Sequence, residues 1–250
     1  YGKMTEKKVL FITGAAIGIG HAACLKFASE GYAIAFNDYN QENGEKAEKE
    51  LKEKGYVVLF LPGDATDENA VKAMVAKTVE TYGRIDTLIN NAGGLGGRST
   101  FEGMETAFWN RVMDLNLTGA FFASRECIPY LKETRGTIIN ITSIAAYNGG
   151  GPGAGVYAAA KAAVLTMTRA MAKELIPAGV RVNAVSPGTI DTAFHAASSK
   201  ELLASFVKAI PAGRMGQPGE VADVMYYLAS EQSSYLVGEV IQINGGQMML

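Results

Sequence analysis

Short apolar runs alternate with longer amphipathic segments along almost the whole chain. Seven runs are apolar throughout, a pattern that predicts strands covered by helices on both faces: Val9–Thr13, Ala33–Asn37, Val57–Leu61, Thr87–Asn90, Thr137–Thr142, Val180–Val185 and Val240–Ile243. Segments with a 3.6-residue period lie between them and predict helices at Gly18–Ser29, Gln41–Lys54, Glu68–Tyr82, Thr106–Lys132, Val156–Ile176 and Glu220–Ala229. This alternation predicts an α/β fold, a doubly wound seven-stranded parallel sheet with helices on both faces.

The chain shows no linker, repeat or charge block, so residues 4–250 are expected to form a single domain. Tyr1–Lys3 precede Met4 and are interpreted as a remnant of the expression vector, outside the fold. The segment Thr189–Gly213 is longer than a connection requires, and long loops in compact domains usually serve function. We expect a substrate lid there, whose apolar side chains exclude water: Phe194, Leu202, Leu203 and Phe206.

Composition and charge exclude several functional classes. Hydrophobic residues make up 48% and charged residues 19% of the 250, which is typical of a folded protein. The net charge of −2 and the lack of basic runs argue against nucleic-acid binding. No apolar run approaches the ~18 residues of a membrane span, and no signal peptide is recognised. Cys24 and Cys127 have no metal-ligand neighbours, nor do His21 and His195, so we expect buried thiols, no metal and a cytoplasmic location.

A glycine-rich loop follows the first predicted strand and leads directly into a helix. Gly14, Gly18 and Gly20 are spaced Gly-x3-Gly-x-Gly, and glycine is abundant overall, with 29 in the chain. Such a loop lets backbone N–H groups approach a pyrophosphate at a helix N-terminus. A purely structural turn is the alternative, but the position between strand and helix favours a Rossmann-type dinucleotide site.

Asp38 ends the second predicted strand, eighteen residues after Gly20. A carboxylate there can accept hydrogen bonds from both hydroxyls of an adenosine ribose and repels a 2′-phosphate. The neighbouring Ile17 and Tyr39 offer no positive charge. We therefore expect NAD(H) as the cofactor and NADP to be disfavoured; a solvated aspartate at a strand end is the alternative.

Tyr157 and Lys161 stand four residues apart, which places a phenol and an ammonium on one face of a helix. A pair of this kind is expected by chance in such a composition, so its setting matters more. Ser143 directly follows the fifth predicted strand, and ligands of open α/β sheets bind at the carboxyl ends of strands. The sequence thus predicts that these residues meet near the glycine loop.

From Lys8 to Gly246 the chain resembles the short-chain dehydrogenase/reductase family. The motifs that carry the resemblance occur in the family's order: the glycine loop, Asn90-Asn91-Ala92-Gly93, Asn116 within Asp114–Gly119, Ser143, Tyr157-x3-Lys161 and Pro187–Thr192. The resemblance implies a Rossmann-type fold, a nicotinamide cofactor and carbonyl–alcohol chemistry.

The resemblance implies four catalytic residues. Tyr157 would be the acid in reduction and the base in oxidation, with the pKa of its phenol lowered by the nearby Lys161 cation. Lys161 would also hold the nicotinamide ribose, and Ser143 would orient the substrate oxygen. Asn116 would hold a water in a proton relay; a helix-kink residue that satisfies backbone groups is the alternative.

Other positions are implied as cofactor contacts. Asp64 and Ala65 would meet the adenine, although Asp64 could also be a turn or cap aspartate. The full cofactor-binding set, in which Tyr157 and Lys161 are included, is Gly14, Ala16, Ile17, Gly18, Ile19, Gly20, Asp38, Tyr39, Asp64, Ala65, Asn91, Ala92, Gly93, Pro187, Gly188, Ile190 and Thr192.

Two loops depart from the family pattern by being rich in glycine. They are Gly93–Arg98 and Ile144–Val156, which would form opposite walls of the substrate site, so their shape cannot be taken from the resemblance. Arg98 is a candidate for recognition of an anionic substrate, with a solvated surface arginine as the alternative. Asn244 replaces the aspartate that is usual before the double glycine.

These observations predict an NAD-dependent alcohol dehydrogenase or ketoreductase that acts on a small secondary alcohol, diol or sugar, and on the corresponding ketone. The alternative is a 3-oxoacyl-[acyl-carrier-protein] reductase, which shares the motifs but usually prefers NADPH and carries a basic patch. Asp38, Thr134 and Ala178 provide neither feature. A remote alternative is a non-catalytic dinucleotide-binding module. Family members are commonly homotetramers, and the long apolar helices agree with this.

Overall fold

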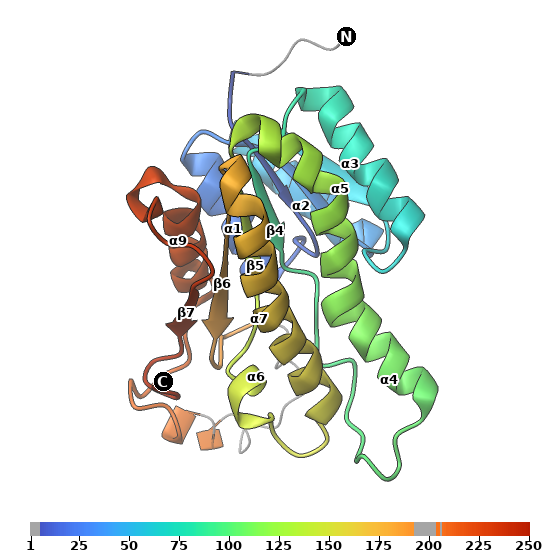
Figure 1. Cartoon of the computed structure of the whole chain (residues 1–250), viewed down its shortest axis with the longest axis vertical. Coiled ribbons are helices and arrows are strands. Elements are labelled where there is room, and N and C mark those ends of the chain that lie inside the picture. The colour runs from blue at the N-terminus through green and yellow to red at the C-terminus, as the bar shows by residue number, and fades with distance from the viewer. Residues whose placement is uncertain (1–5, 193–203, 206) are drawn as a thin grey trace.

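Seven parallel strands form one continuous sheet in the order β3-β2-β1-β4-β5-β6-β7 (Figure 1). The computed structural model describes residues 6–192, 204–205 and 207–250. The strands are β1 Val9–Ile12, β2 Ala33–Asp38, β3 Val58–Pro62, β4 Thr87–Asn90, β5 Thr137–Ile141, β6 Arg181–Pro187 and β7 Val240–Ile243. The predicted doubly wound α/β fold is confirmed, and the predicted strand ends agree to within two residues.

Helices connect the strands and cover both faces of the sheet. The α-helices are α1 Gly18–Ser29, α2 Gln41–Glu53, α3 Glu68–Tyr82, α4 Thr106–Met113, α5 Gly119–Thr134, α6 Ala145–Asn148, α7 Gly155–Leu175 and α9 Pro218–Ala229. Two short 3₁₀ turns, Ile176–Ala178 and Glu231–Ser233, precede β6 and β7. Local capping fixes some starts: the Asp67 side chain accepts the backbone N–H groups of Asn69 and Ala70 at the start of α3.

The core explains why the strands are apolar throughout. Successive side chains of β1 point to opposite faces: Leu10 and Ile12 join the core beneath α1, α2 and α9, whereas Val9 and Phe11 join the core beneath α3, α5 and α7. All four side chains are fully buried. Because both faces are covered, neither face can be polar without loss of the stabilisation that burial provides.

The predicted helix Thr106–Lys132 is interrupted, so this prediction was wrong in its middle. A π-helical turn, Asp114–Thr118, separates α4 from α5. The Asn116 side chain within it donates to the Val112 carbonyl at 2.9 Å. A side chain that bonds to the backbone in this way stabilises a break in the helical hydrogen-bond ladder, and π turns often occur at functional sites.

The base of the predicted lid is anchored on both sides. Gly216 N donates to the Thr189 carbonyl at 3.0 Å, and Asp191 N donates to the Gly216 carbonyl at 2.8 Å. These bonds form a short parallel bridge between Ile190 and Gly216. Five of the residues singled out in this region lie outside the described residues: Phe194, His195, Leu202, Leu203 and Phe206.

The structure also shows the surroundings of the two cysteines and of His21. Cys24 and Cys127 are buried free thiols, as predicted, and burial raises the pKa of both. His21 is partly exposed beside Glu50. Across the described ranges, no three His, Cys, Asp or Glu side chains gather as a metal site. Among those same residues, every helix is too short or too polar to cross a membrane.

Candidate active site

The carboxyl ends of the central strands open into one cavity of about 800 Å³. In Figure 1 the arrowheads of β6 and β7 point toward this edge, where α6 also lies. Most of the site residues expected from the sequence line the cavity: Gly14, Ile17, Gly18, Ile19, Gly20, Asp38, Tyr39, Asn91, Ala92, Gly93, Ser143, Tyr157, Lys161, Pro187, Gly188, Ile190 and Thr192. Ala16, Asp64, Ala65 and Asn116 are not among the lining residues. The cavity is large enough for a dinucleotide and a small substrate.

The glycine loop approaches the end of β4 so closely that side chains do not fit. A Cβ atom added to Gly14, whose φ is +62°, would lie 2.7 Å from the Ala92 Cα, and one added to Gly20 would lie 2.6 Å from the Asn91 Nδ2. No side chain caps the N-terminus of α1, which begins at Gly18. The first N–H groups of α1 therefore face the cavity without a side-chain acceptor, as a pyrophosphate site requires.

Gly20→Ala is expected to destabilise the fold and weaken dinucleotide binding. Its Cβ would also lie 2.7 Å from the Ala15 Cα and 2.8 Å from the Gly14 carbonyl oxygen, so backbone must move. Overpacking of this kind costs about 1–3 kcal/mol, which corresponds to roughly 2–12 °C in Tm for a chain of this size. Thermal unfolding with and without NADH measures both effects. Gly219→Ala in α9 is the control, because its added Cβ has no neighbour within 4 Å; an equal loss in both variants would contradict the argument.

Asp38 is fixed at the end of β2, with only 7% of its surface exposed. Its Oδ2 accepts from Ala16 N at 3.0 Å, and its Oδ1 accepts from Asn40 N at 3.0 Å. These two bonds hold the carboxylate against the glycine loop. The described cavity residues around it, Ile17, Tyr39, Asn40 and Asn43, carry no positive charge. A dinucleotide therefore meets a negative group at this end of the cavity.

Asp64 has the geometry of a turn aspartate. Its Oδ1 accepts from both the backbone N–H and the hydroxyl of Thr66, each at 2.8 Å, and the side chain is exposed. Ala65 is buried, and its carbonyl oxygen lies 2.7 Å from the position of a Cβ added to Gly119. The turn interpretation thus has direct geometric support, while adenine contact by these two residues remains a prediction.

Ser143, Tyr157 and Lys161 converge at the centre of the cavity. Ser143 and Tyr157 share a hydrogen bond, and the Ser143 Oγ also accepts from Ala145 N at 3.1 Å. Lys161, one turn after Tyr157 on α7, donates from Nζ to the Ile141 carbonyl at 3.0 Å. The Lys161 Nζ lies 5.8 Å from the centre of the Tyr157 ring. The strand end and the helix thus hold the hydroxyl, phenol and ammonium in one group.

Burial dominates the titration of both ionisable residues. It raises the pKa of the Tyr157 phenol, which the Ser143 hydrogen bond only partly opposes, and it lowers the pKa of Lys161 to about 8. Desolvation of the phenolate opposes the expected lowering of the Tyr157 pKa by Lys161, which stays a prediction. At neutral pH Tyr157 is protonated, which is the state that an acid needs.

Asn116 is engaged with backbone groups on two sides. Besides Val112, its Nδ2 donates to the Gly94 carbonyl at 2.8 Å, and its Oδ1 accepts from Gly94 N at 3.0 Å. A Cβ on Gly93 would lie 2.8 Å from the Asn116 Oδ1 and 3.0 Å from the Lys161 Nζ. This geometry matches the interpretation of Asn116 as a helix-kink residue, and Asn116 also holds the loop after β4. Its role in binding a relay water remains a prediction.

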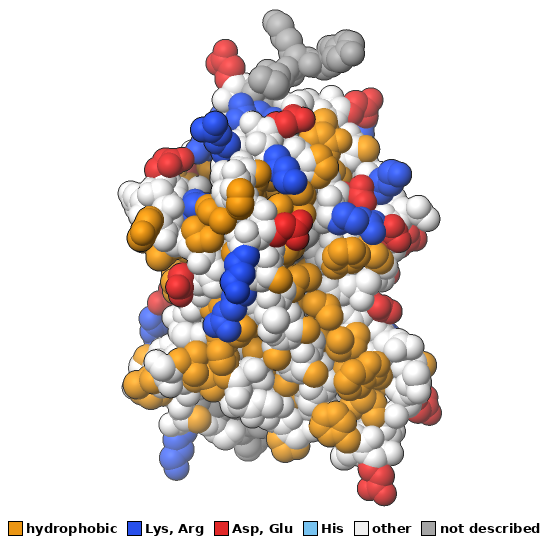
Figure 2. All heavy atoms as spheres, in the orientation of Figure 1, with side chains coloured by type: hydrophobic (Ala, Val, Ile, Leu, Met, Phe, Trp, Pro, Cys, Tyr) orange, Lys and Arg blue, Asp and Glu red, His pale blue; other side chains and the backbone are white. Residues whose placement is uncertain are grey.

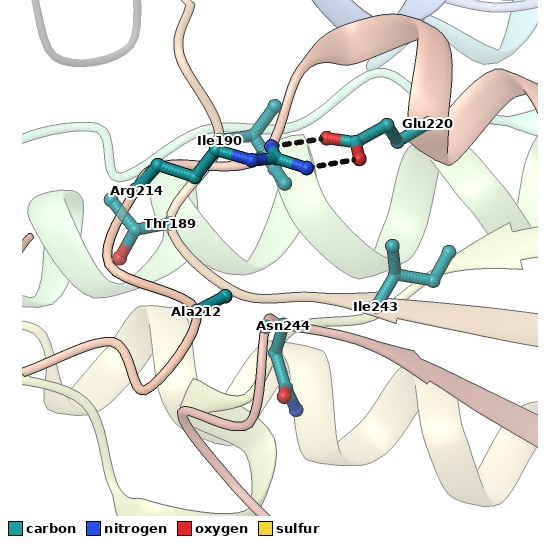
Figure 3. Close-up of a pocket in the computed structure, with 9 residues that line it drawn as sticks. Thr189, Ile190, Ala212, Arg214, Glu220, Ile243 and Asn244 are labelled. Carbon is teal, nitrogen blue, oxygen red and sulfur yellow. Dashed lines mark hydrogen bonds and ion pairs between the residues drawn. The ribbon is translucent and has the colours of Figure 1, made fainter.

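The loop after β6 is held from behind by the C-terminal segment. Thr189 donates from its N to the Gln247 Oε1 at 3.1 Å. A smaller hollow of about 90 Å³ lies behind this loop, and Figure 3 shows Arg214 reaching across to Glu220 at its edge. The guanidinium makes two bonds to that carboxylate, at 2.8 and 2.7 Å. This hollow is too small for a dinucleotide, so we interpret it as part of the support of the loop.

The two glycine-rich loops contact each other and form one wall of the cavity. Ser99 N donates to the Gly153 carbonyl at 3.0 Å, and Arg98 Nη1 donates to the Pro152 carbonyl at 2.6 Å. The prediction that the two loops form opposite walls was therefore wrong, because direct hydrogen bonds join them. Five lining residues belong to the two loops that the sequence assigned to the substrate site: Leu95, Asn148, Gly150, Gly151 and Ala154. The lining residues that the sequence did not predict as contacts include Asn43, Leu115, Ile141, Thr142 and Gln247.

Comparison with known proteins identifies the family. A family model described as enoyl-(acyl carrier protein) reductase matches residues 14–248. The chain is 41% identical to the 3-oxoacyl-[acyl-carrier-protein] reductase FabG of Thermotoga maritima, with 96% of this chain and 98% of the relative covered. It is 36% identical to FabG of Staphylococcus aureus, with 99% and 100% covered. The chain belongs to the short-chain dehydrogenase/reductase family.

Solved structures agree with this short-chain dehydrogenase/reductase assignment. The 3-oxoacyl-[acyl-carrier protein] reductase from Brucella melitensis matches with a TM-score of 0.90 and 36% identity over 97% of this chain and 92% of that one. The NADH-dependent reductase A1-R′, responsible for alginate metabolism, matches with a TM-score of 0.89 and 35% identity over 98% of each. The protein is thus an oxidoreductase of a family that binds a nicotinamide dinucleotide, as the sequence predicted.

Proposed function

We propose that the protein is an NADH-dependent carbonyl reductase that interconverts a small secondary alcohol, diol or sugar and the corresponding ketone. The observation that supports this cofactor choice is the position of Asp38. Its buried carboxylate is held by two backbone N–H groups where the ribose of the cofactor would lie. A negative charge at this position disfavours a 2′-phosphate. The NADH-dependent reductase A1-R′, a structural relative, supports the same cofactor choice.

The proposed chemistry assigns one task to each central residue. A bound nicotinamide supplies the hydride. Ser143 donates a hydrogen bond to the substrate oxygen, and Tyr157 protonates that oxygen as charge develops on it. Lys161, buried beside them, stabilises the phenolate that Tyr157 leaves behind. In the oxidation direction the Tyr157 phenolate takes the proton from the alcohol.

The second candidate is reduction of a 3-oxoacyl group on an acyl carrier protein. The named FabG relatives, at 36–41% identity, favour it. Thr134 and Ala178 are uncharged where the family resemblance implies a basic patch. Arg135, however, directly follows Thr134, and its Cγ lies 3.2 Å from the position of a Cβ added to Gly179. One cation is therefore present on this surface.

Oxidation of NADH and, in a parallel assay, of NADPH distinguishes the two candidates. Small ketones, ketoses and acetoacetyl-acyl carrier protein are compared at equal concentration, with acetoacetyl-coenzyme A as the carrier-free control. We expect turnover of small ketones or ketoses without any carrier. Turnover confined to the carrier-bound thioester would establish the second candidate, and turnover of no carbonyl compound would contradict both.

We further propose that the enzyme is a homotetramer, as is common in the family. Apolar side chains are exposed on the single chain, including Met249 and Leu250 at the C-terminus and Phe121 on α5. Figure 2 shows orange apolar side chains gathered in the lower half of the face that carries α4 and α7, whereas charged side chains concentrate in the upper half and at the edges. An apolar face of this kind is typical of a subunit interface.

A further inference from the structure

Arg98 lies on the wall that the two glycine-rich loops build around the substrate end of the cavity. Among the described lining residues, the positive side chains are those of Arg98 and Lys161, and the negative one is that of Asp38. Asp38 lies at the adenosine end and Lys161 belongs to the catalytic group. Arg98 shares its wall with Asn148 and Gly151, which the cavity also exposes. A positive group thus faces the space where a substrate would bind.

The backbone of the second glycine-rich loop fixes the base of the Arg98 side chain. A Cβ added to Gly153, whose φ is +75°, would lie 2.9 Å from the Arg98 Cβ and 3.2 Å from Ser99 N. Only glycine allows this approach. The Arg98 Nη1 then donates to the Pro152 carbonyl at 2.6 Å. The guanidinium is held by neutral backbone, so its charge is not compensated by this contact.

Five arginines of the described residues lack an ion pair, and of these five only Arg98 lines the cavity. Arg84, Arg125 and Arg214 each pair with a carboxylate. Within residues 6–192, 204–205 and 207–250, Arg98 has no ion pair. A guanidinium carries five N–H donors in a rigid fork that matches a carboxylate, and the Pro152 contact uses one of them.

We propose that Arg98 binds the carboxylate of the substrate, so that the preferred ketone or alcohol is an oxo acid or a hydroxy acid. This inference rests on the proposed function, because it names the substrate class of the same site. The carboxylate accepts the remaining guanidinium N–H groups at the glycine-loop wall, while the carbonyl of the same molecule lies at Ser143 and Tyr157. Binding at both ends fixes which face of the ketone receives the hydride.

Matched pairs of acid and ester test the proposal. Acetoacetate is compared with methyl acetoacetate, and levulinate with methyl levulinate, using NADH and wild-type, Arg98→Gln and Arg111→Gln enzymes. Arg111 is the control, because it bonds to the Gly96 carbonyl at 3.5 Å and does not line the cavity. In the wild type and in Arg111→Gln, we expect kcat/KM for the acid of at least one pair to exceed that for its ester by about tenfold or more. In Arg98→Gln the acid-to-ester ratio of kcat/KM is expected to fall to about one.

The acid-to-ester ratio separates recognition from structure. An Arg98 that only joins the two loops would change acid and ester turnover equally. Equal use of acid and ester by the wild type, or a preference that survives in Arg98→Gln, overturns the proposal. If no ketone is turned over, the proposed function fails, and binding of glutarate to the NADH complex, followed by NADH fluorescence, decides the inference separately. Glutarate binding that Arg98→Gln weakens supports the carboxylate site, and no binding overturns it.

Discussion

Tyr157→Phe is expected to lower kcat for ketone reduction by about 10²–10⁴-fold, the usual contribution of a positioned acid. The variant loses only the hydroxyl that bonds to Ser143 and protonates the substrate oxygen. The aromatic ring stays beside Lys161, so the dissociation constant of NADH is expected to change little. Stopped-flow measurement of a single turnover reports the loss directly, because it separates hydride transfer from product release.

Tyr147→Phe is the matched control for this experiment. Tyr147 belongs to α6, and its hydroxyl accepts from the Gln242 Nε2 at 3.1 Å without lining the cavity. We expect its kcat to stay near that of the wild type. Retained turnover in Tyr157→Phe, or an equal loss in both variants, would show that the phenol is not the acid. A non-catalytic dinucleotide-binding protein would show no turnover in any variant.

The second large effect concerns the cofactor. The wild type is expected to have a kcat/KM for NADH at least about tenfold above that for NADPH, because Asp38 repels the 2′-phosphate. In Asp38→Asn the negative charge is lost while the side-chain shape is kept. The ratio of the two kcat/KM values is then expected to move toward NADPH by about tenfold or more. Part of the NADH activity also falls, since an amide has only one oxygen for the N–H groups of Ala16 and Asn40.

Glu42→Gln provides the control for charge alone. Glu42 is exposed in the first turn of α2, near Asp38 in sequence, and does not line the cavity. The ratio of kcat/KM for NADH to kcat/KM for NADPH is expected to be the same in Glu42→Gln as in the wild type. A wild type that prefers NADPH would refute the role assigned to Asp38. An equal change of the NADH-to-NADPH ratio in Asp38→Asn and Glu42→Gln would show that the effect comes from net charge at long range. Measurement at two salt concentrations separates these effects, because salt screens the exposed Glu42 more than the buried Asp38.

Three features of the site could be predicted because each is encoded in a short stretch of sequence. The glycine loop needs only a strand, three glycines and a helix in succession, and Tyr157 and Lys161 need only one helical turn between them. Asp38 was recognised by its distance from the loop. Each signal is local, so it survives without knowledge of the tertiary structure.

The π turn at Asn116 and the wall containing Arg98 could not be predicted in the same way. The helical period runs through Asp114–Thr118 without a break, and only the bonds from Asn116 to Gly94, 22 residues away, reveal why the ladder opens there. Arg98 and Pro152 are 54 residues apart. The glycines permit many backbone conformations in each loop, and only the contact between the two loops selects one of them.

The sequence by itself determined the order of the elements, the parallel sheet buried on both faces, the glycine loop and the residue types of the candidate site, since hydrophobic period and motif spacing act over a few residues. The tertiary structure decided what the cavity presents to a substrate. It fixed Asp38 by a hydrogen bond from the glycine loop, raised the pKa of Tyr157 by burial and placed the Arg98 cation on the cavity wall. These properties depend on desolvation and on contacts between distant segments, which exist only once the chain has folded.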